Sequence, residues 1–161
     1  MNKPGETPDE RSVLRESFVD LYETEFVAMV RLAIALTGSE AAAEDLVHDA
    51  FIRVHKHWKH VEHPRAYLRA AVVNACRSAG RRAARERDAN ARQIVDVVSL
   101  GADEVFDALA ALPYRQRAAL VLQFYEGLSQ SEIADALGCR EGTVASLVHR
   151  GLGQLRKVIE R

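Results

Sequence analysis

The sequence predicts an all-α protein of two small helical domains joined by a flexible linker, with a helix-turn-helix in the second domain. Apolar residues recur at steps of three and four through most of the 161 residues, which is the period of an amphipathic helix. β-Branched residues cluster only at 94–98, so strands are not expected. Residues 112–161 have the pattern of short helices joined by glycine turns.

The first domain is predicted to hold three helices. Residues 1–11 are polar and are expected to be disordered. The apolar period then predicts one helix over 12–36 and a second over 40–58. A third helix, over 64–86, opens on Pro64, because proline is favoured in a first helical turn.

A linker is predicted between the domains. Residues 88–102 have poor helical periodicity, contain Ser99 and Gly101, and are followed by acidic residues. This stretch separates a domain over 12–87 from one over 103–161. A linker of this kind lets the two domains move independently until a partner holds them.

The second domain carries the most specific pattern in the chain. A helix over 113–127 ends at a glycine, and Ser129 and Glu132 form a capping box that starts a short helix. Gly138 ends that helix, and an amphipathic helix follows from about Glu141. Such a helix-turn-helix places its second helix in the DNA major groove, so DNA binding is predicted. The alternative is an ordinary small helical bundle.

Charge is unevenly distributed although the net charge is only −1. Residues 1–50 have four basic and eleven acidic residues, a net charge of −7, whereas residues 51–92 have eleven basic and three acidic, a net charge of +8. The net charge is −4 over 93–112 and +2 over 113–161. An acidic surface beside a basic one suggests two partners, and the basic stretch is typical of phosphate binding.

Composition narrows the possible classes of protein and their cellular location. Cys76 and Cys139 lie far apart and do not form a disulfide framework, which favours a reducing, cytoplasmic location. No signal peptide or membrane-spanning segment is found, so no membrane insertion is expected. No appended regulatory module is expected after Arg161.

Five histidines lie within residues 48–63, and histidine is a common metal ligand. His60 and His63 have chelating spacing only in a helix, which Pro64 disfavours, and no cysteine or carboxylate pair completes a ligand set. We therefore expect no metal, no cofactor and no catalytic residue, and so no enzyme. A metal-dependent helical hydrolase and an autonomous helix-turn-helix regulator remain the rival functions.

Three segments together resemble one family. Residues 43–55 (AEDLVHDAFIRVH) resemble the helix with which bacterial sigma factors bind RNA polymerase, and residues 63–78 resemble their promoter-melting helix. Residues 112–117 (LPYRQR) and 142–146 (GTVAS) resemble their promoter-reading C-terminal domain. Over about 14–160, the order and spacing resemble the extracytoplasmic-function (ECF) group of the sigma-70 family.

This resemblance implies a transcription initiation factor. Residues 12–87 would form the region 2 domain, which binds polymerase and melts the −10 element, and 103–161 the region 4 domain, which reads the −35 element. The implied partners are core RNA polymerase (its clamp helices and flap), promoter DNA and an anti-sigma factor. We expect the free chain to bind a promoter poorly and to become specific only with polymerase.

The resemblance and the charge pattern indicate three sets of site residues. The polymerase-binding set is Asp45, His48, Asp49 and Arg53, for which a solvated helix face is the alternative. The −10 set is Trp58, Lys59, His60, His63, Tyr67, Asn74, Arg77, Arg81 and Arg82. The −35 set is Arg140, Thr143, Ser146, His149 and Arg150.

Different chemistry is expected of different members of these sets. Asn74 suits base edges and the arginines suit phosphates, while the loop 59–63 resembles the family's segment for holding a flipped base. Trp58 and Tyr67 offer stacking surfaces, with core packing as the alternative for each.

The sequence departs from the family at three site positions. Ala145 and Leu147 replace basic residues that relatives carry, which weakens the expected phosphate contact of the recognition helix. His48 stands where glutamine is common, and both side chains can form hydrogen bonds.

Overall fold

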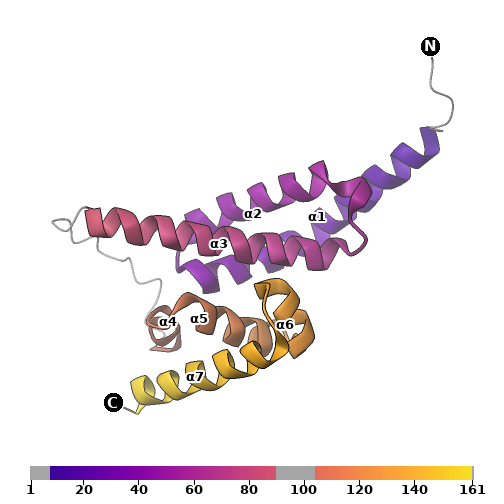
Figure 1. The fold of residues 1–161 in the computed structure, drawn as a ribbon. Coiled ribbons are helices and arrows are strands. Elements are labelled where there is room, and N and C mark those ends of the chain that lie inside the picture. The colour runs from indigo at the N-terminus through magenta and orange to yellow at the C-terminus, as the bar shows by residue number, and fades with distance from the viewer. Residues whose placement is uncertain (1–7, 90–103, 161) are drawn as a thin grey trace.

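The computed structural model describes residues 8–89 and 104–160, and every regular element in these ranges is helical (Figure 1). The predicted all-α class is therefore confirmed for the described part of the chain. The first domain consists of α1 (Pro8–Thr37), α2 (Glu40–Lys56), the short 3-10 helix η1 (Trp58–His60) and α3 (Pro64–Ala89).

The first domain packs as a three-helix bundle around a stripe of apolar side chains on α2. Gly38, at φ +73°, takes the left-handed conformation that separates α1 from α2. Ser39 then caps α2, because its Oγ accepts a hydrogen bond from the Ala42 N–H at 3.2 Å. Val47 and Phe51 are buried, as the helical period predicts.

The second domain contains the predicted helix-turn-helix. Ser129 Oγ accepts from the Glu132 N–H at 3.2 Å, and the Glu132 carboxylate accepts from the Ser129 N–H at 2.8 Å, so both halves of the capping box are present. Gly138 ends the first helix of the motif in the left-handed conformation, at φ +62°. The elements are α4 (Glu104–Ala110), α5 (Tyr114–Leu120), the π-helical turn η2 (Val121–Tyr125), α6 (Gln130–Leu137) and α7 (Glu141–Ile159).

Several predicted boundaries differ from the structure. Helix α1 begins at Pro8, inside the stretch 1–11 that was expected to be disordered, and residues 1–7 lie outside the described range. A proline in the first helical turn loses no hydrogen bond, so a helix start at Pro8 has no backbone cost. Trp58 belongs to η1 and not to α2, which ends at Lys56.

Two other expectations are modified or fall outside the structure. The helix predicted over 113–127 changes to π-helical geometry after Leu120, and Gly127 follows it at φ +68°. The predicted linker is helical at residues 88–89, and its remainder, with the β-branched cluster 94–98, lies outside the described residues.

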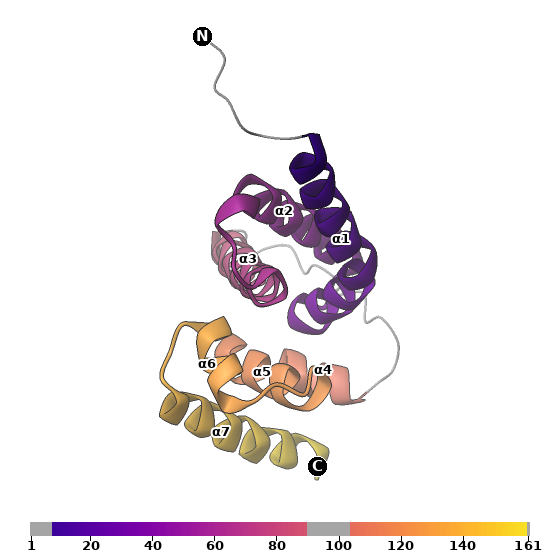
Figure 2. The ribbon, with the colours of Figure 1, turned by 90° about the vertical axis from the view of Figure 1, so that its right-hand side faces the viewer.

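The two domains are packed against each other. In both views α6 lies against α3, and α7 lies on the side of the second domain that faces away from the first (Figures 1 and 2). Buried side chains of both domains form one continuous core, in which Val73 and Cys76 of α3 join Leu112 and Leu120. No sequence pattern marked this contact.

The two cysteines are expected to differ sharply in reactivity. Cys76 is 1% exposed, and burial raises the pKa of its thiol to about 12, whereas Cys139 is half-buried in the turn before α7. Because the thiolate is the nucleophile, iodoacetamide at mildly alkaline pH should modify Cys139 and leave Cys76 intact until denaturant is added. Peptide mass spectrometry measures this, and equal labelling of both thiols in the native chain would contradict the packing described.

Candidate functional site

The predicted polymerase-binding residues lie on one exposed side of α2. The side chains of Asp45, His48, Asp49 and Arg53 are all exposed, and the buried stripe occupies the opposite side of the helix. The His48 ring is 5.0 Å from the ring of Phe26 on α1, so its orientation is set by a contact with that neighbouring helix. The face thus combines two carboxylates, an imidazole and a guanidinium on a rigid element.

Ile52 is a member of this face that sequence reasoning missed. Its side chain is 52% exposed, and it follows Asp45 by seven residues and Asp49 by three, so all three lie on the same side of α2. The available signal was its position outside the apolar stripe. An exposed isoleucine amid charged groups gives this face an apolar centre.

The aromatic members of the −10 set have different environments. Trp58 is half-buried, and its ring packs edge-on against Phe18 with 5.3 Å between ring centroids. This is the core packing that was the alternative to base stacking. Tyr67 is exposed on the first turns of α3, and Lys59, His60 and His63 are exposed around the η1 segment.

The polar residues of α3 adjoin the polymerase-binding face. Asn74, Arg81 and Arg82 are exposed, whereas Arg77 is half-buried. A cavity of about 220 Å³ lies between α2 and α3, and Asn74 and Arg82 line it from one side while Asp49 and Arg53 line it from the other. The structure therefore brings members of two predicted sets to the edges of a single cleft.

The −35 set lies on the exposed side of α7. Arg140 is the N-cap residue of the helix, and Thr143, Ser146, His149 and Arg150 are exposed along it. Val144, Val148 and Gly151 form the buried side, and Gly151 approaches so closely that an added Cβ would lie 2.9 Å from Leu120 Cδ1. Leu147 is half-buried against the core, which accounts for an apolar residue at this position, whereas Ala145 is exposed.

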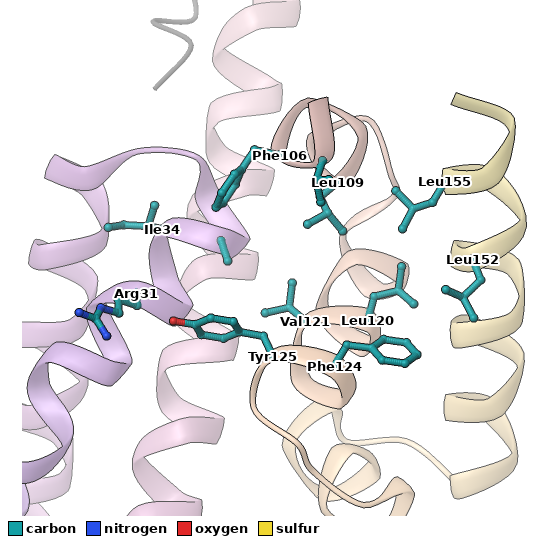
Figure 3. Close-up of a pocket in the computed structure, with 12 residues that line it drawn as sticks. Arg31, Ile34, Phe106, Leu109, Leu120, Val121, Phe124, Tyr125, Leu152 and Leu155 are labelled. Carbon is teal, nitrogen blue, oxygen red and sulfur yellow. The ribbon is translucent and has the colours of Figure 1, made fainter. Parts of the chain in front are cut away.

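An apolar groove between the domains was not predicted from the sequence. It has a volume of about 600 Å³ and is bounded by α1, α4, η2 and α7 (Figure 3). Phe106, Phe124 and Leu152 are large exposed apolar side chains in its wall, and Tyr125 points across it toward Arg31 of α1. These side chains come from four elements, so no local sequence pattern identifies the groove.

Comparison with known families matches both domains. Residues 21–86 match sigma-70 region 2, and residues 102–155 match sigma-70 region 4. The chain belongs to the sigma-70 family. Its similarity to ECF sigma factors places it in the ECF group, so this sigma factor binds core RNA polymerase and directs promoter-specific initiation of transcription. The matches favour this function over an autonomous regulator.

Relatives extend over nearly the whole chain. RNA polymerase sigma-E factor of Streptomyces antibioticus is 31% identical over 89% of this chain and 84% of its own length. ECF RNA polymerase sigma factor SigL of Mycobacterium tuberculosis is 32% identical over 87% of both chains. Within residues 8–89 and 104–160, no helix is long and apolar enough to cross a membrane.

A solved structure is similar to this chain over both domains. The sigma factor RpoE of Bartonella quintana, in complex with the anti-sigma factor NepR, is similar to this chain with a TM-score of 0.76 and 26% sequence identity. The similarity covers 90% of this chain and 98% of that one, so it includes region 2 and region 4 together. We call the arrangement in which region 4 packs on region 2 the closed arrangement. It is similar to that of a sigma factor in complex with an anti-sigma factor.

Proposed function

We propose that this sigma factor divides its work among three exposed faces: the α2 face binds polymerase, α3 with η1 reads the −10 element, and α7 reads the −35 element. The observation that carries the assignment is that each face is largely polar and exposed and lies opposite buried apolar side chains. Promoter-specific transcription by core polymerase with variants of each face tests it. Variants of the α2 face should lose polymerase binding, whereas variants of α3 with η1 or of α7 should lose recognition of the −10 or the −35 element.

The α2 face has the composition of a protein–protein contact. Ile52 supplies an apolar centre, and Asp45, Asp49 and Arg53 surround it with charge. Interfaces of this kind gain affinity from a desolvated centre, while the charged rim sets orientation and excludes wrong partners. The aromatic packing of His48 fixes one edge of the face before binding.

The α3 face combines phosphate contacts with a base-reading group. Arg81 and Arg82 lie exposed toward the end of α3, and Asn74 lies about two turns earlier, beside the cleft between α2 and α3. Phosphate contacts position the DNA without reading sequence, whereas an amide can pair with a base edge. We therefore assign affinity to the arginines and discrimination to Asn74.

Removing two arginines from α3 should weaken promoter binding for every sequence alike. The variant Arg81→Ala plus Arg82→Ala loses two phosphate contacts, so the slope of log K against log salt should fall in magnitude by about 1.4 to 1.8. Titration of holoenzyme with promoter DNA at several salt concentrations measures it. Arg156→Ala plus Lys157→Ala, an equal charge change at the far end of α7, is the matched control and should keep the slope. An unchanged slope in the α3 variant would remove these residues from the DNA interface.

An anti-sigma factor is the remaining proposed partner. The similarity to RpoE in complex with NepR includes both domains, and the apolar groove of Figure 3 offers a partner surface from both of them. A partner bound there contacts region 2 and region 4 at once and holds the closed arrangement. We place this sigma factor in the cytoplasm, where polymerase and promoter are, and assign it no covalent chemistry of its own.

A further inference from the structure

Two short hydrogen bonds connect region 4 directly to region 2. Tyr114 Oη donates to the Val73 carbonyl at 2.6 Å, and Arg117 Nη1 donates to the Leu36 carbonyl at 2.6 Å. The donors belong to α5, and the acceptors belong to α3 and α1. We call these two bonds the interdomain contact.

Arg117 is positioned by both domains. Its guanidinium also donates to the carbonyls of Leu109 at 2.9 Å, Ala110 at 3.2 Å and Leu112 at 2.9 Å, around the end of α4. Leu36 lies in the last turn of α1, where carbonyls lack an intrahelical N–H partner and the helix dipole favours a cation. One half-buried cation thus joins the C-terminal ends of two helices from different domains, with charge-assisted hydrogen bonds.

Tyr114 forms the part of the interdomain contact that lies on α3. Burial raises the pKa of its phenol well above the usual range, so the hydroxyl stays protonated and can donate to Val73 at physiological pH. Cys76 is buried on α3 one turn after Val73, the residue whose carbonyl accepts the Tyr114 bond. Arg77, a predicted −10 residue, follows it and is half-buried.

The closed arrangement is too small to occupy a promoter. Elements centred at −10 and −35 are about 25 base pairs apart, or about 85 Å along B-DNA at 3.4 Å per base pair. A compact chain of this length has a radius of gyration of about 15 Å. With α6 packed on α3, the chain therefore cannot place α3 and α7 on both elements of straight duplex.

We propose that the interdomain contact of Tyr114 and Arg117 makes this sigma factor autoinhibited: it holds region 4 on region 2 in the free chain and must break when polymerase binds. The inference rests on the proposed function for its promoter geometry, whereas the contact itself does not depend on it. Closure lowers the apparent affinity for polymerase, because that affinity equals the intrinsic affinity multiplied by the fraction of chains that are open. It also supplies a structural reason for weak promoter binding by the free chain.

The test uses Cys76 as a probe of opening. In a Cys139→Ser background, Cys76 is the remaining thiol, and its rate of reaction with Ellman's reagent reports the exposure of the α3 surface beneath Tyr114. Tyr114→Phe removes one hydrogen bond and little volume, so the rate should rise about fivefold, and the affinity for core polymerase should rise by the same factor. Ser131→Ala is the control, because it removes an exposed hydroxyl of α6 that takes no part in the interdomain contact, and it should change neither.

A second variant tests the other bond. Arg117→Lys keeps the positive charge but cannot bridge four carbonyls, so Cys76 should again react faster. Urea unfolding of each variant shows whether its domains remain folded. Equal thiol rates in wild type and Tyr114→Phe would overturn the contact as a determinant of closure, and so would an equal effect of Ser131→Ala. Faster thiol reaction without tighter polymerase binding would overturn autoinhibition. Failure of wild type to support promoter-specific transcription would refute the proposed function and would leave the thiol result standing.

Discussion

Reversing two charges on α2 should abolish holoenzyme formation. In the variant Asp45→Arg plus Asp49→Arg, both substituted side chains are exposed, so helix content and folding stability should change little. If the α2 face binds polymerase as proposed, two attractive contacts become repulsive, and like-charge juxtaposition across an interface costs several kcal/mol. Circular dichroism checks the fold, and size-exclusion chromatography or a binding titration with core polymerase measures the loss.

A matched variant separates a local effect from net charge. Asp20→Arg plus Glu23→Arg makes the same charge change on exposed positions of α1, outside the proposed polymerase face, and should still form holoenzyme. If the α2 variant bound polymerase normally, the assignment of this face would be wrong. If both variants failed equally, the binding would depend on overall charge and not on these two carboxylates.

Removing an arginine from the recognition helix should relax −35 specificity. Arg140 and Arg150 are exposed, at the N-cap and in the middle of α7 respectively. An arginine bound bidentately to guanine discriminates by about 1–3 kcal/mol, so Arg140→Ala or Arg150→Ala should lose that discrimination at particular bases. Arg156→Ala, at the end of the same helix, should keep it.

The readout is a set of promoters with single −35 substitutions, transcribed by holoenzyme containing wild type or each variant. The expected result is that a variant becomes indifferent at one or two positions while its discrimination elsewhere is unchanged. Equal tolerance of every −35 substitution by wild type and variants would exclude direct reading by α7.

The local structure could be predicted from the sequence because its determinants are local. The capping box of Ser129 and Glu132 and the left-handed Gly138 specify the helix-turn-helix within ten residues. The apolar period of α2 determines which side is buried, and so places Asp45 and Asp49 on the exposed side. Helix boundaries differ more from the prediction. Helix α1 starts earlier than predicted, and the helix after Pro113 becomes π-helical, which no residue type indicates.

The interdomain contact could not be predicted from the sequence. Tyr114 and Val73 are 41 residues apart, and Arg117 and Leu36 are 81 apart. In both pairs the acceptor is a backbone carbonyl, a group that every residue carries, so the sequence holds no sign of the partner. The environment of Trp58 depends likewise on Phe18, forty residues away on another helix. Ile52 was not predicted because the charge pattern that marks this face does not include an apolar side chain outside the buried stripe.

The most direct measurement is promoter-specific transcription from purified components. Core RNA polymerase is mixed with this chain and with a library of promoters randomised at the −10 and −35 elements, and the transcribed templates are sequenced. The account predicts transcripts only when both protein components are present, enrichment of one sequence at each element, and loss of all transcripts with the Asp45→Arg plus Asp49→Arg variant. Transcription without enrichment, or sequence-specific binding by the chain that leaves polymerase inactive, would contradict it.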